Sequence, residues 1–586
     1  MMKSLVVYLK PYWPLLLLTV LLLLGQAMAE LYLPTLMAEI VNEGIEPGIR
    51  EGVPQTGFIL RTGGLMLFIA LLAGLASISA AYISPRVAAG AARDMRRDLF
   101  TKVENFSQGE FDKFSSASLI TRCTNDVAQV QNLANVTARL LLYAPIMGIG
   151  GVIMALTRSV SMSWIIALAV IVLLGFVAMI IIVVMPKFKI LQEMVDTLNK
   201  ISREILHGLM VIRAFGTQNH EKTRFDGINA DLRDTGLFIG RVMAIAGPAI
   251  TFIMGGTQIL VIWVGANQVA ASGLPIGDMI AFMQYAMQVI IAFMMMSFML
   301  VMVPRAMVSA ARIAEVLDTE LTITDPANPV AFTSDESSEP NGLRGHVEFK
   351  NVRFRYPGAE TDVISEINFT AQPGQTTAII GATGSGKSTI ANLLLRFYDV
   401  TDGCVMVDGV DIRQVRQADL RNKIGYVPQK GQLLTGTIAS NIRYGMPSAT
   451  EDEVATAATV AQAINFIEEK ENKFDFEISQ GGSNVSGGQR QRLSIARALA
   501  KKPAILVFDD SFSALDFQTD AKLRKALKTH TAQATVIVIA QRVGTIMNAE
   551  QILVLDEGQI VGRGTHDELL VSCPAYYEIT SSQGTV

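Results

Sequence analysis

A glycine-rich segment follows a short run of β-branched residues and precedes a run of helix formers. It reads GATGSGKST and fits the pattern G-x-x-x-x-G-K-[ST]. Glycines let backbone N–H groups converge on phosphate oxygens, and the following helix adds the positive end of its dipole. Lys387 would neutralise charge on the β- and γ-phosphates, and Ser388 would ligate Mg²⁺. The segment therefore predicts a nucleotide site formed by Gly381, Thr383, Gly384, Ser385, Gly386, Lys387, Ser388 and Thr389.

A second group of chemically suited residues lies about a hundred positions further along the chain, in NVSGGQRQRLSIARALAKKPAILVFDD. The run from Ser486 to Gln489 enters a predicted helix and offers another set of backbone N–H donors. The apolar run that follows predicts a buried strand, residues 504–508, with Asp509 at its end. A carboxylate in that place can hold Mg²⁺.

These segments, in this order, resemble the nucleotide-binding domain of an ATP-binding-cassette (ABC) protein, over residues 344–586. The resemblance implies an α/β fold of mostly parallel strands with an antiparallel edge, binding ATP and Mg²⁺. It also implies that Tyr356, in FRYPG, stacks on adenine. Gln429, in IGYVPQK, would sense Mg²⁺ and touch the membrane domain. The Mg²⁺ ligands would then be Ser388, Gln429 and Asp509, the last through water.

The resemblance further implies that two such domains enclose two ATP molecules. Each ATP would lie between the glycine-rich loop of one chain and the SGGQ run of the other. The run of this chain, Ser486, Gly487, Gly488 and Gln489, would therefore contact the ATP of a partner.

Two residues depart from the family pattern at the positions nearest the attacked phosphate. Asp510 stands where active members have a glutamate that polarises the attacking water, and Gln541 stands where they have a histidine. The Asp510 carboxylate falls back by roughly 1–1.5 Å, and a misplacement of that size can cost on the order of 100-fold in rate. Glutamine can donate a hydrogen bond to the γ-phosphate, but it cannot carry a proton as imidazole does.

We therefore expect this chain to bind ATP and to hydrolyse it slowly at its own site. A homodimer would contain two weak sites, so the pattern favours a heterodimer. Its partner would be a second homologous half-transporter that supplies the glutamate and the histidine. The chain then resembles one half of the bacterial heterodimeric multidrug exporters.

The elements before residue 340 differ in composition from the nucleotide-binding part. Half of the 586 residues are hydrophobic, 17% are charged, and the net charge is −4. Six windows approach the roughly 20 apolar residues that cross a bilayer, namely 13–34, 63–84, 140–157, 164–185, 242–264 and 280–303. They are too many and too long for the core of a soluble protein, and no basic stripe suited to nucleic acid accompanies them. We expect six transmembrane helices of the exporter type.

Lys and Arg concentrate between the second and third windows and between the fourth and fifth. The positive-inside rule then places these segments and both termini in the cytoplasm. Both segments are rich in helix formers, so we expect helices that continue out of the membrane. Each would end in a short turn, near residues 110–127 and 213–225, that docks on the nucleotide-binding domains.

Two features of the predicted spans could contact cargo. Glu30 lies near the outer end of the first span, where a carboxylate is either functional or reaches the interface to stay hydrated. The sixth span is rich in methionine, which suits a surface for varied apolar ligands but also packs as an ordinary helix former.

The sequence thus predicts a transmembrane domain over residues 1–320, a polar linker over 321–343 and a nucleotide-binding domain over 344–586. We expect export of hydrophobic or amphipathic compounds, drugs or lipids, across the plasma membrane by alternating access. Two other interpretations stay open: a homodimeric exporter, and a regulatory or channel-like subunit gated by nucleotide binding alone.

Overall fold

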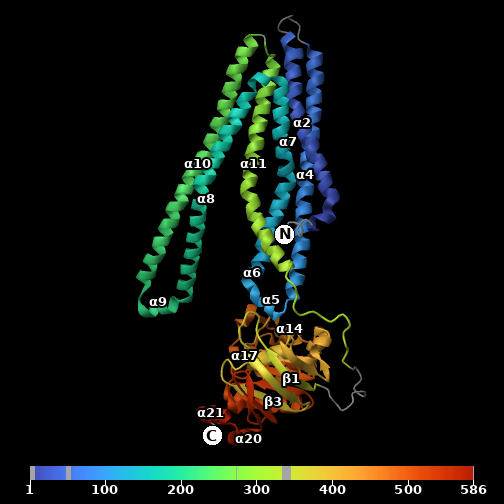
Figure 1. The fold of residues 1–586 in the computed structure, drawn as a ribbon, viewed down its shortest axis with the longest axis vertical. Coiled ribbons are helices and arrows are strands. Elements are labelled where there is room, and N and C mark those ends of the chain that lie inside the picture. Colours follow the sequence, from blue (N-terminus) through green and yellow to red (C-terminus); the bar gives the residue numbers. More distant parts are fainter. Residues whose placement is uncertain (1–6, 48–54, 272, 333–344, 585–586) are drawn as a thin grey trace. The chain divides into compact units, whose positions relative to one another are not determined.

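The computed structural model of the chain describes residues 7–47, 55–271, 273–332 and 345–584 (Figure 1). It divides into two compact units. The first contains residues 1–104 and 116–319, and the second contains residues 105–115 and 320–586. Of the predicted linker, residues 333–343 lie outside the described residues.

The first unit is built from long helices. These are α2 (Trp13–Glu39), α4 (Thr56–Glu104), α7 (Val127–Arg158), α8 (Ser163–His207), α10 (Gln218–Ala270) and α11 (Ile276–Leu317). Within the described residues, five helical stretches are long and apolar enough to cross a membrane: Val7–Ile45, Thr56–Glu104, Val160–His207, Gln218–Ala270 and Ile276–Leu317. The third predicted span, 140–157, lies in α7, whose apolar part is the shorter Leu142–Arg158. The predicted membrane-spanning helical class is confirmed.

Shorter helical elements connect and extend the long helices of this unit. They are η1 (Lys10–Tyr12), η2 (Ile40–Ile45), α6 (Ser116–Thr121), η3 (Arg122–Asp126), η4 (Val160–Met162) and α9 (Leu209–Phe215).

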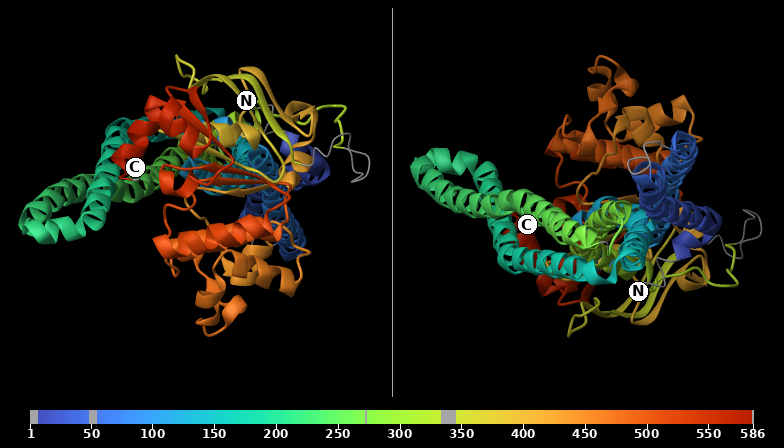
Figure 2. Two further views of the ribbon diagram at one scale, coloured as in Figure 1. Left: turned by 90° about the horizontal axis from the view of Figure 1, so that it is seen from below. Right: turned by 90° about the horizontal axis from the view of Figure 1, so that it is seen from above.

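Helices α4, α8 and α10 extend well beyond the thickness of a bilayer. At about 1.5 Å per residue, the 53 residues of α10 span roughly 80 Å, against about 30 Å for a hydrocarbon core. Helices α8 and α10 run side by side and are joined by α9, which lies away from α7 and α11 (Figures 1 and 2). We call this pair with its tip the α8–α10 arm.

Helix α7 packs closely between α2 and α11 because small residues line its contacts. A Cβ atom added to Gly151 would lie 2.8 Å from Cγ2 of Val289 in α11, and one added to Gly150 would lie 2.4 Å from Cδ1 of Leu31 in α2. Close approach of this kind provides much of the attraction between helices in a membrane, where the hydrophobic effect contributes little.

The second unit contains a six-stranded sheet in the order β12-β11-β3-β10-β9-β6. Strands β3 (Thr376–Gly381), β6 (Ile424–Val427), β9 (Ile505–Asp509), β10 (Thr535–Ile539) and β11 (Gln551–Asp556) are parallel, and β12 (Gln559–Gly564) is the antiparallel edge. A second, antiparallel sheet has the order β2-β1-β4-β5, from β1 (Val347–Phe354), β2 (Ile364–Ala371), β4 (Asp402–Val407) and β5 (Val410–Asp411). The predicted α/β class is confirmed.

Helices and one short strand pair complete the second unit. The helices are α5 (Gln108–Lys113), α12 (Lys387–Leu394), α13 (Gln417–Lys423), α14 (Ile438–Arg443), α15 (Glu451–Val460), α16 (Ile464–Glu468), α17 (Gly487–Ala500), α18 (Phe517–His530), α19 (Val543–Ile546), α20 (His566–Ser572) and α21 (Pro574–Ser582). The strand pair is β7 (Gly436–Thr437) and β8 (Glu477–Ile478), and the 3-10 turns are η5 (Ile412–Gln414), η6 (Lys473–Asp475) and η7 (Gln480–Gly482).

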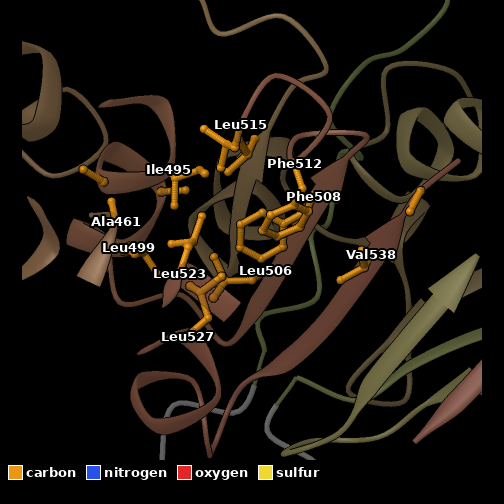
Figure 3. Close-up of a cluster of buried hydrophobic side chains, with 14 of the residues drawn as sticks. Ala461, Ile495, Leu499, Leu506, Phe508, Phe512, Leu515, Leu523, Leu527 and Val538 are labelled. Carbon is orange, nitrogen blue, oxygen red and sulfur yellow. The ribbon is translucent and has the colours of Figure 1, made fainter. Parts of the chain in front are cut away.

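A buried cluster supports β9 from one side of the sheet (Figure 3). Phe508 and Phe512 pack with ring centroids 5.2 Å apart, and Leu523 of α18 is fully buried among Ile495, Leu499 and Leu527. These contacts fix where β9 ends, and therefore where Asp509 and Asp510 lie.

We predict that Leu523→Ala lowers the stability of the second unit by about 2–5 kcal/mol, because it leaves a cavity beside β9. A thermal unfolding scan of the purified chain measures this as a lower transition temperature. Val571→Ala is the matched control, because Val571 is 90% exposed on α20 and should leave the transition unchanged. Equal transitions for the two variants would contradict the packing described here.

Candidate functional site

The predicted nucleotide-site residues cluster at one edge of the six-stranded sheet. Strands β3, β10, β9 and β6 are adjacent and parallel, so their carboxyl ends lie together. The glycine-rich loop follows β3, Gln541 follows β10, Asp509 ends β9, and Gln429 follows β6. Open α/β sheets bind ligands at this edge. The structure therefore brings together residues that are up to 160 positions apart.

The glycine-rich loop is shaped by backbone conformations that favour glycine. Gly386 has φ 95° at the N-terminus of α12, and a Cβ there would lie 2.5 Å from Cγ2 of Ile364. Nζ of the buried Lys387 donates to the backbone oxygens of Gly381 at 2.9 Å and Ala382 at 2.7 Å. Burial lowers the pKa of Lys387, whereas Asp510 and Asp509 act to raise it. The lysine thus lies folded over the loop that it is predicted to serve.

Ser388 and Asp509 form the predicted Mg²⁺ site. Oγ of Ser388 donates to Oδ1 of Asp509 at 2.9 Å. Burial raises the pKa of Asp509, and the hydrogen bond from Ser388 opposes this rise. A hydroxyl and one carboxylate are the hard oxygen donors that Mg²⁺ takes when phosphates complete its shell. In the described part of the chain, no group of three or more His, Cys, Asp or Glu forms a metal site made by protein alone. The residues fit a nucleotide-bound Mg²⁺.

Asp510 is held by its backbone and its side chain. It adopts φ 45°, and its N–H donates to the backbone oxygen of Ile539 in β10 at 2.8 Å. Its Oδ2 accepts a hydrogen bond from Nε2 of Gln429 at 3.1 Å. Gln429 therefore contacts Asp510, while Ser388 contacts Asp509, so the predicted Mg²⁺ ligands form two adjacent pairs.

Tyr356 lies beside the glycine-rich loop. Its hydroxyl is 3.0 Å from Oγ1 of Thr389 in α12. Its ring meets the rings of Phe354 and Tyr398 edge-on, with centroids 4.8 and 5.2 Å away. The aromatic ring predicted to stack on adenine is thus anchored next to the phosphate-binding helix.

The SGGQ run forms a cap of its own on α17. The N–H of Gln489 donates to Oγ of Ser486 at 3.2 Å, and the N–H of Ser486 donates to Oε1 of Gln489 at 3.0 Å. This reciprocal pair satisfies donors at the helix N-terminus. Ser486 and Gly487 are exposed. Among the residues that the structure describes, no hydrogen bond joins the run to the glycine-rich loop.

Gln583 is a residue that the sequence analysis missed. It follows α21, and its side chain holds the segment after β10 at two points: Nε2 donates to the backbone oxygen of Gln541 at 2.8 Å, and Oε1 accepts from the N–H of Val543 at 2.9 Å. A glutamine near a chain end, outside any recognised motif, carries no sequence signal for this role.

Helix α5 packs against the nucleotide-binding fold of its own unit. Oδ2 of Asp112 accepts from the Tyr398 hydroxyl at 2.9 Å, and Oε1 of Glu110 accepts from the N–H and hydroxyl of Thr322 at 3.0 and 2.6 Å. Burial acts to raise the pKa of Glu110, but the hydrogen bonds from Ser107 and Thr322 lower it overall. Tyr398 also contacts Tyr356, so Tyr398 connects α5 with the residue predicted to stack on adenine.

Two family profiles and several curated proteins match this chain. The profile of the ABC transporter transmembrane region matches residues 16–293, and that of the ABC transporter domain matches residues 364–513. A Mycobacterium tuberculosis protein named an uncharacterized ABC transporter ATP-binding protein is 40% identical over 98% of this chain and 97% of its own length. The ATP-dependent lipid A-core flippase of Pseudomonas aeruginosa is 33% identical over 86% of this chain and 82% of its own.

A solved structure of a bacterial Atm1-family ABC exporter with ATP bound has the same fold. The TM-score is 0.73 with 24% identity, and the match covers 97% of both chains.

We predict that Gln583→Leu accelerates amide hydrogen exchange in the segment 540–546, most of all at Val543, whose N–H loses its acceptor. Each lost hydrogen bond contributes about 0.5–1.5 kcal/mol, which corresponds to a roughly 2- to 13-fold change in local opening. Mass-spectrometric exchange on the full chain measures it. The neighbouring Ser582→Ala is the control and should leave exchange unchanged. Unaltered exchange at Val543 in Gln583→Leu would contradict the contact.

Proposed function

Because the chain belongs to the ABC transporter family, as an exporter half-transporter with both domain types, we propose that it works as the degenerate-site subunit of a heterodimeric exporter. The observation that carries this proposal is that Asp510 and Gln541 follow β9 and β10 at the sheet edge that holds the glycine-rich loop, Ser388 and Asp509, in the positions where active family members have a glutamate and a histidine. Its cargo would be hydrophobic or amphipathic compounds.

In this proposal the chain binds ATP with the glycine-rich loop, Lys387 and Tyr356. On nucleotide binding, Nζ of Lys387 would exchange the loop carbonyls for phosphate oxygens, which offer a charge-assisted bond. Ser388 and Asp509 would hold Mg²⁺, which supplies charge neutralisation at the β- and γ-phosphates. These roles stabilise the bound nucleotide whether or not it is cleaved.

Hydrolysis at this site would be slow for two reasons. The Asp510 carboxylate is short, and its position is fixed by backbone and side-chain contacts to Ile539 and Gln429. It can therefore move little toward the water that it would have to orient, and general-base reach extends only about 2.6–3.2 Å. Gln541 lies on a segment held by Gln583 and offers an amide in place of an ionisable ring.

The SGGQ run would complete the competent site of the partner. Its exposed N-terminal residues and the positive dipole end of the 14-residue helix α17 suit contact with phosphate oxygens from another chain. The partner would supply the glutamate and the histidine for the ATP enclosed there.

The α8–α10 arm supports assembly with a second chain. At its tip, Leu206, Met210 and Phe215 are 73, 78 and 79% exposed. Large apolar side chains gathered at one exposed place mark an interaction site. In the exporter layout this tip would dock on the nucleotide-binding domain of the partner, and α5 on that of its own chain.

Transport would follow from alternating access in the plasma membrane, with both termini in the cytoplasm. Enclosure of two ATP molecules would turn the cavity outward, and hydrolysis at the competent site would reset it. The lipid flippase among the relatives supports an apolar or lipid-like cargo. A regulatory subunit gated by nucleotide binding alone is the second candidate, because slow hydrolysis at this site would permit it.

We predict that the chain alone hydrolyses ATP at most at a few per cent of the rate of the pair with its partner. Asp510→Glu combined with Gln541→His should raise the rate of the chain alone by at least tenfold, because it restores reach and an ionisable ring. Steady-state phosphate release in detergent or nanodiscs measures both rates. Lys387→Ala in the same background is the control for contaminating activity.

A full exporter rate for the unaltered chain alone would overturn the heterodimer and indicate a homodimeric exporter. If candidate cargo compounds do not stimulate ATP hydrolysis by the pair, the result would favour the nucleotide-gated regulatory subunit.

We also predict that Phe215→Asp weakens assembly with the partner, because it introduces a charge into an apolar contact. Co-purification yield and the ATP hydrolysis rate of the pair should fall at least fivefold, while the chain itself still folds. Val571→Asp, on an exposed position of α20, is the matched control. Undiminished assembly in Phe215→Asp would exclude the tip as a docking element.

A further inference from the structure

A carboxylate lies inside the membrane-spanning unit, between three helices. Glu30 belongs to α2, and its neighbours come from α7 and α11. A carboxylate at membrane depth is costly unless it is paired or used. The contacts of Glu30 therefore indicate whether its charge is paired within the protein or is available to a ligand.

Both carboxylate oxygens of Glu30 accept hydrogen bonds. Oε1 accepts from Nε2 of Gln26, one turn earlier in α2, at 2.9 Å. Oε2 accepts from the hydroxyl of Tyr143 in α7. The backbone oxygen of Glu30 accepts from Nε2 of Gln288 in α11 at 3.2 Å. Glu30 is thus fixed by all three helices and does not extend freely to an interface.

The orientation of both glutamine amides is set by these contacts. Each amide must present its NH₂ group, because its partner is an acceptor that carries no hydrogen. Oε1 of Gln26 and Oε1 of Gln288 are therefore oxygens, and both are buried without a hydrogen-bond partner. An unpaired buried acceptor costs about 1–3 kcal/mol. Two such acceptors, on the two glutamines that contact Glu30, call for an explanation.

No Lys, Arg or His in the described part of the chain forms an ion pair with Glu30, whereas Asp278 in the same unit is paired with Arg158 at 2.9 Å. The polar contact between Tyr285 and Thr35, on the same two helices α11 and α2, is also complete: the tyrosine hydroxyl lies 2.8 Å from Oγ1 of Thr35 and donates to the backbone oxygen of Leu31 at 3.0 Å. Two other buried polar atoms among the described residues of this unit lack a hydrogen-bond partner, Nε of Arg158 and Oδ2 of Asp126, but both residues lie beside an opposite charge, on Asp278 and Arg312 respectively.

The buried side-chain atoms beside Glu30 that lack any partner are both acceptors, the amide oxygens of Gln26 and Gln288. The carboxylate adds its remaining lone pairs and one negative charge. A primary ammonium group has three N–H donors, no acceptor and one positive charge. It matches this set in both number and sign, whereas a phosphate or carboxylate would be repelled.

We propose that Glu30, Gln26 and Gln288 form a binding site for the primary ammonium group of an amphiphile, with Tyr143 as a positioning residue that orients the carboxylate. The apolar part of the ligand would lie among the side chains of α2, α7 and α11. That this ligand is cargo rests on the function proposed above, but its binding does not.

Equilibrium binding to the purified full chain, without nucleotide and in an uncharged detergent, tests the site. The probes are dodecylamine and 1-dodecanol, which share one chain length and differ in the head group. Tryptophan fluorescence or a thermal shift reports binding. We expect dodecylamine to bind at least tenfold more tightly than 1-dodecanol, and Glu30→Gln to abolish this preference. Gln288→Leu should reduce it about threefold or more and provides a second, uncharged test of the same site.

Glu39→Gln is the matched control, since Glu39 is another carboxylate of α2, and it should keep the preference. The site is overturned if the two probes bind equally to the unaltered chain, if Glu30→Gln keeps the preference, or if Glu39→Gln loses it to the same extent. Because the assay contains no ATP, its result is separate from that of the hydrolysis experiments.

Discussion

The alignment of parallel strand ends is the constraint on which the nucleotide site depends. Register pairs Ile539 of β10 with both Ile379 of β3 and Asp509 of β9. The loops after β9 and β10 therefore begin at one level, and the loop after β3 begins two residues beyond it. The Ser388–Asp509 hydrogen bond connects helix α12, which follows the glycine-rich loop, with the end of β9. The cluster around Phe508 and Leu523 holds strand β9 in position. A substitution that loosens this packing would therefore displace Asp509 and Asp510, although it does not alter either residue.

Motifs with local sequence patterns could be predicted, and contacts between distant segments could not. Turns, caps and strand periodicity are determined by residues that are neighbours in the sequence. This holds for the glycine-rich loop, the SGGQ cap and the strand that ends at Asp509. The six apolar windows were readable for the same reason. The roles assigned to Asp510 and Gln541 stay predictions, since they depend on where a bound nucleotide places its γ-phosphate.

The contacts of Gln583 and Tyr143 could not be predicted from the sequence. Each acts across the fold, Gln583 on the segment 541–543 and Tyr143 on Glu30, and nothing in its immediate neighbours distinguishes it. At Glu30 the sequence left two interpretations, functional or reaching the interface. The spacing of Gln26, one turn away, was visible, but the approach of α7 and α11 was not.

The exposed tip of the α8–α10 arm has a consequence for the life of the chain in the cell. In the proposed heterodimer, a newly made copy presents Met210 and Phe215 to water until it meets its partner, and such surface attracts chaperones, proteases and other unfolded chains. Supply of the two subunits in matched amounts would then matter as much as their affinity. An excess of this chain would be removed by quality control rather than accumulate as an idle reserve.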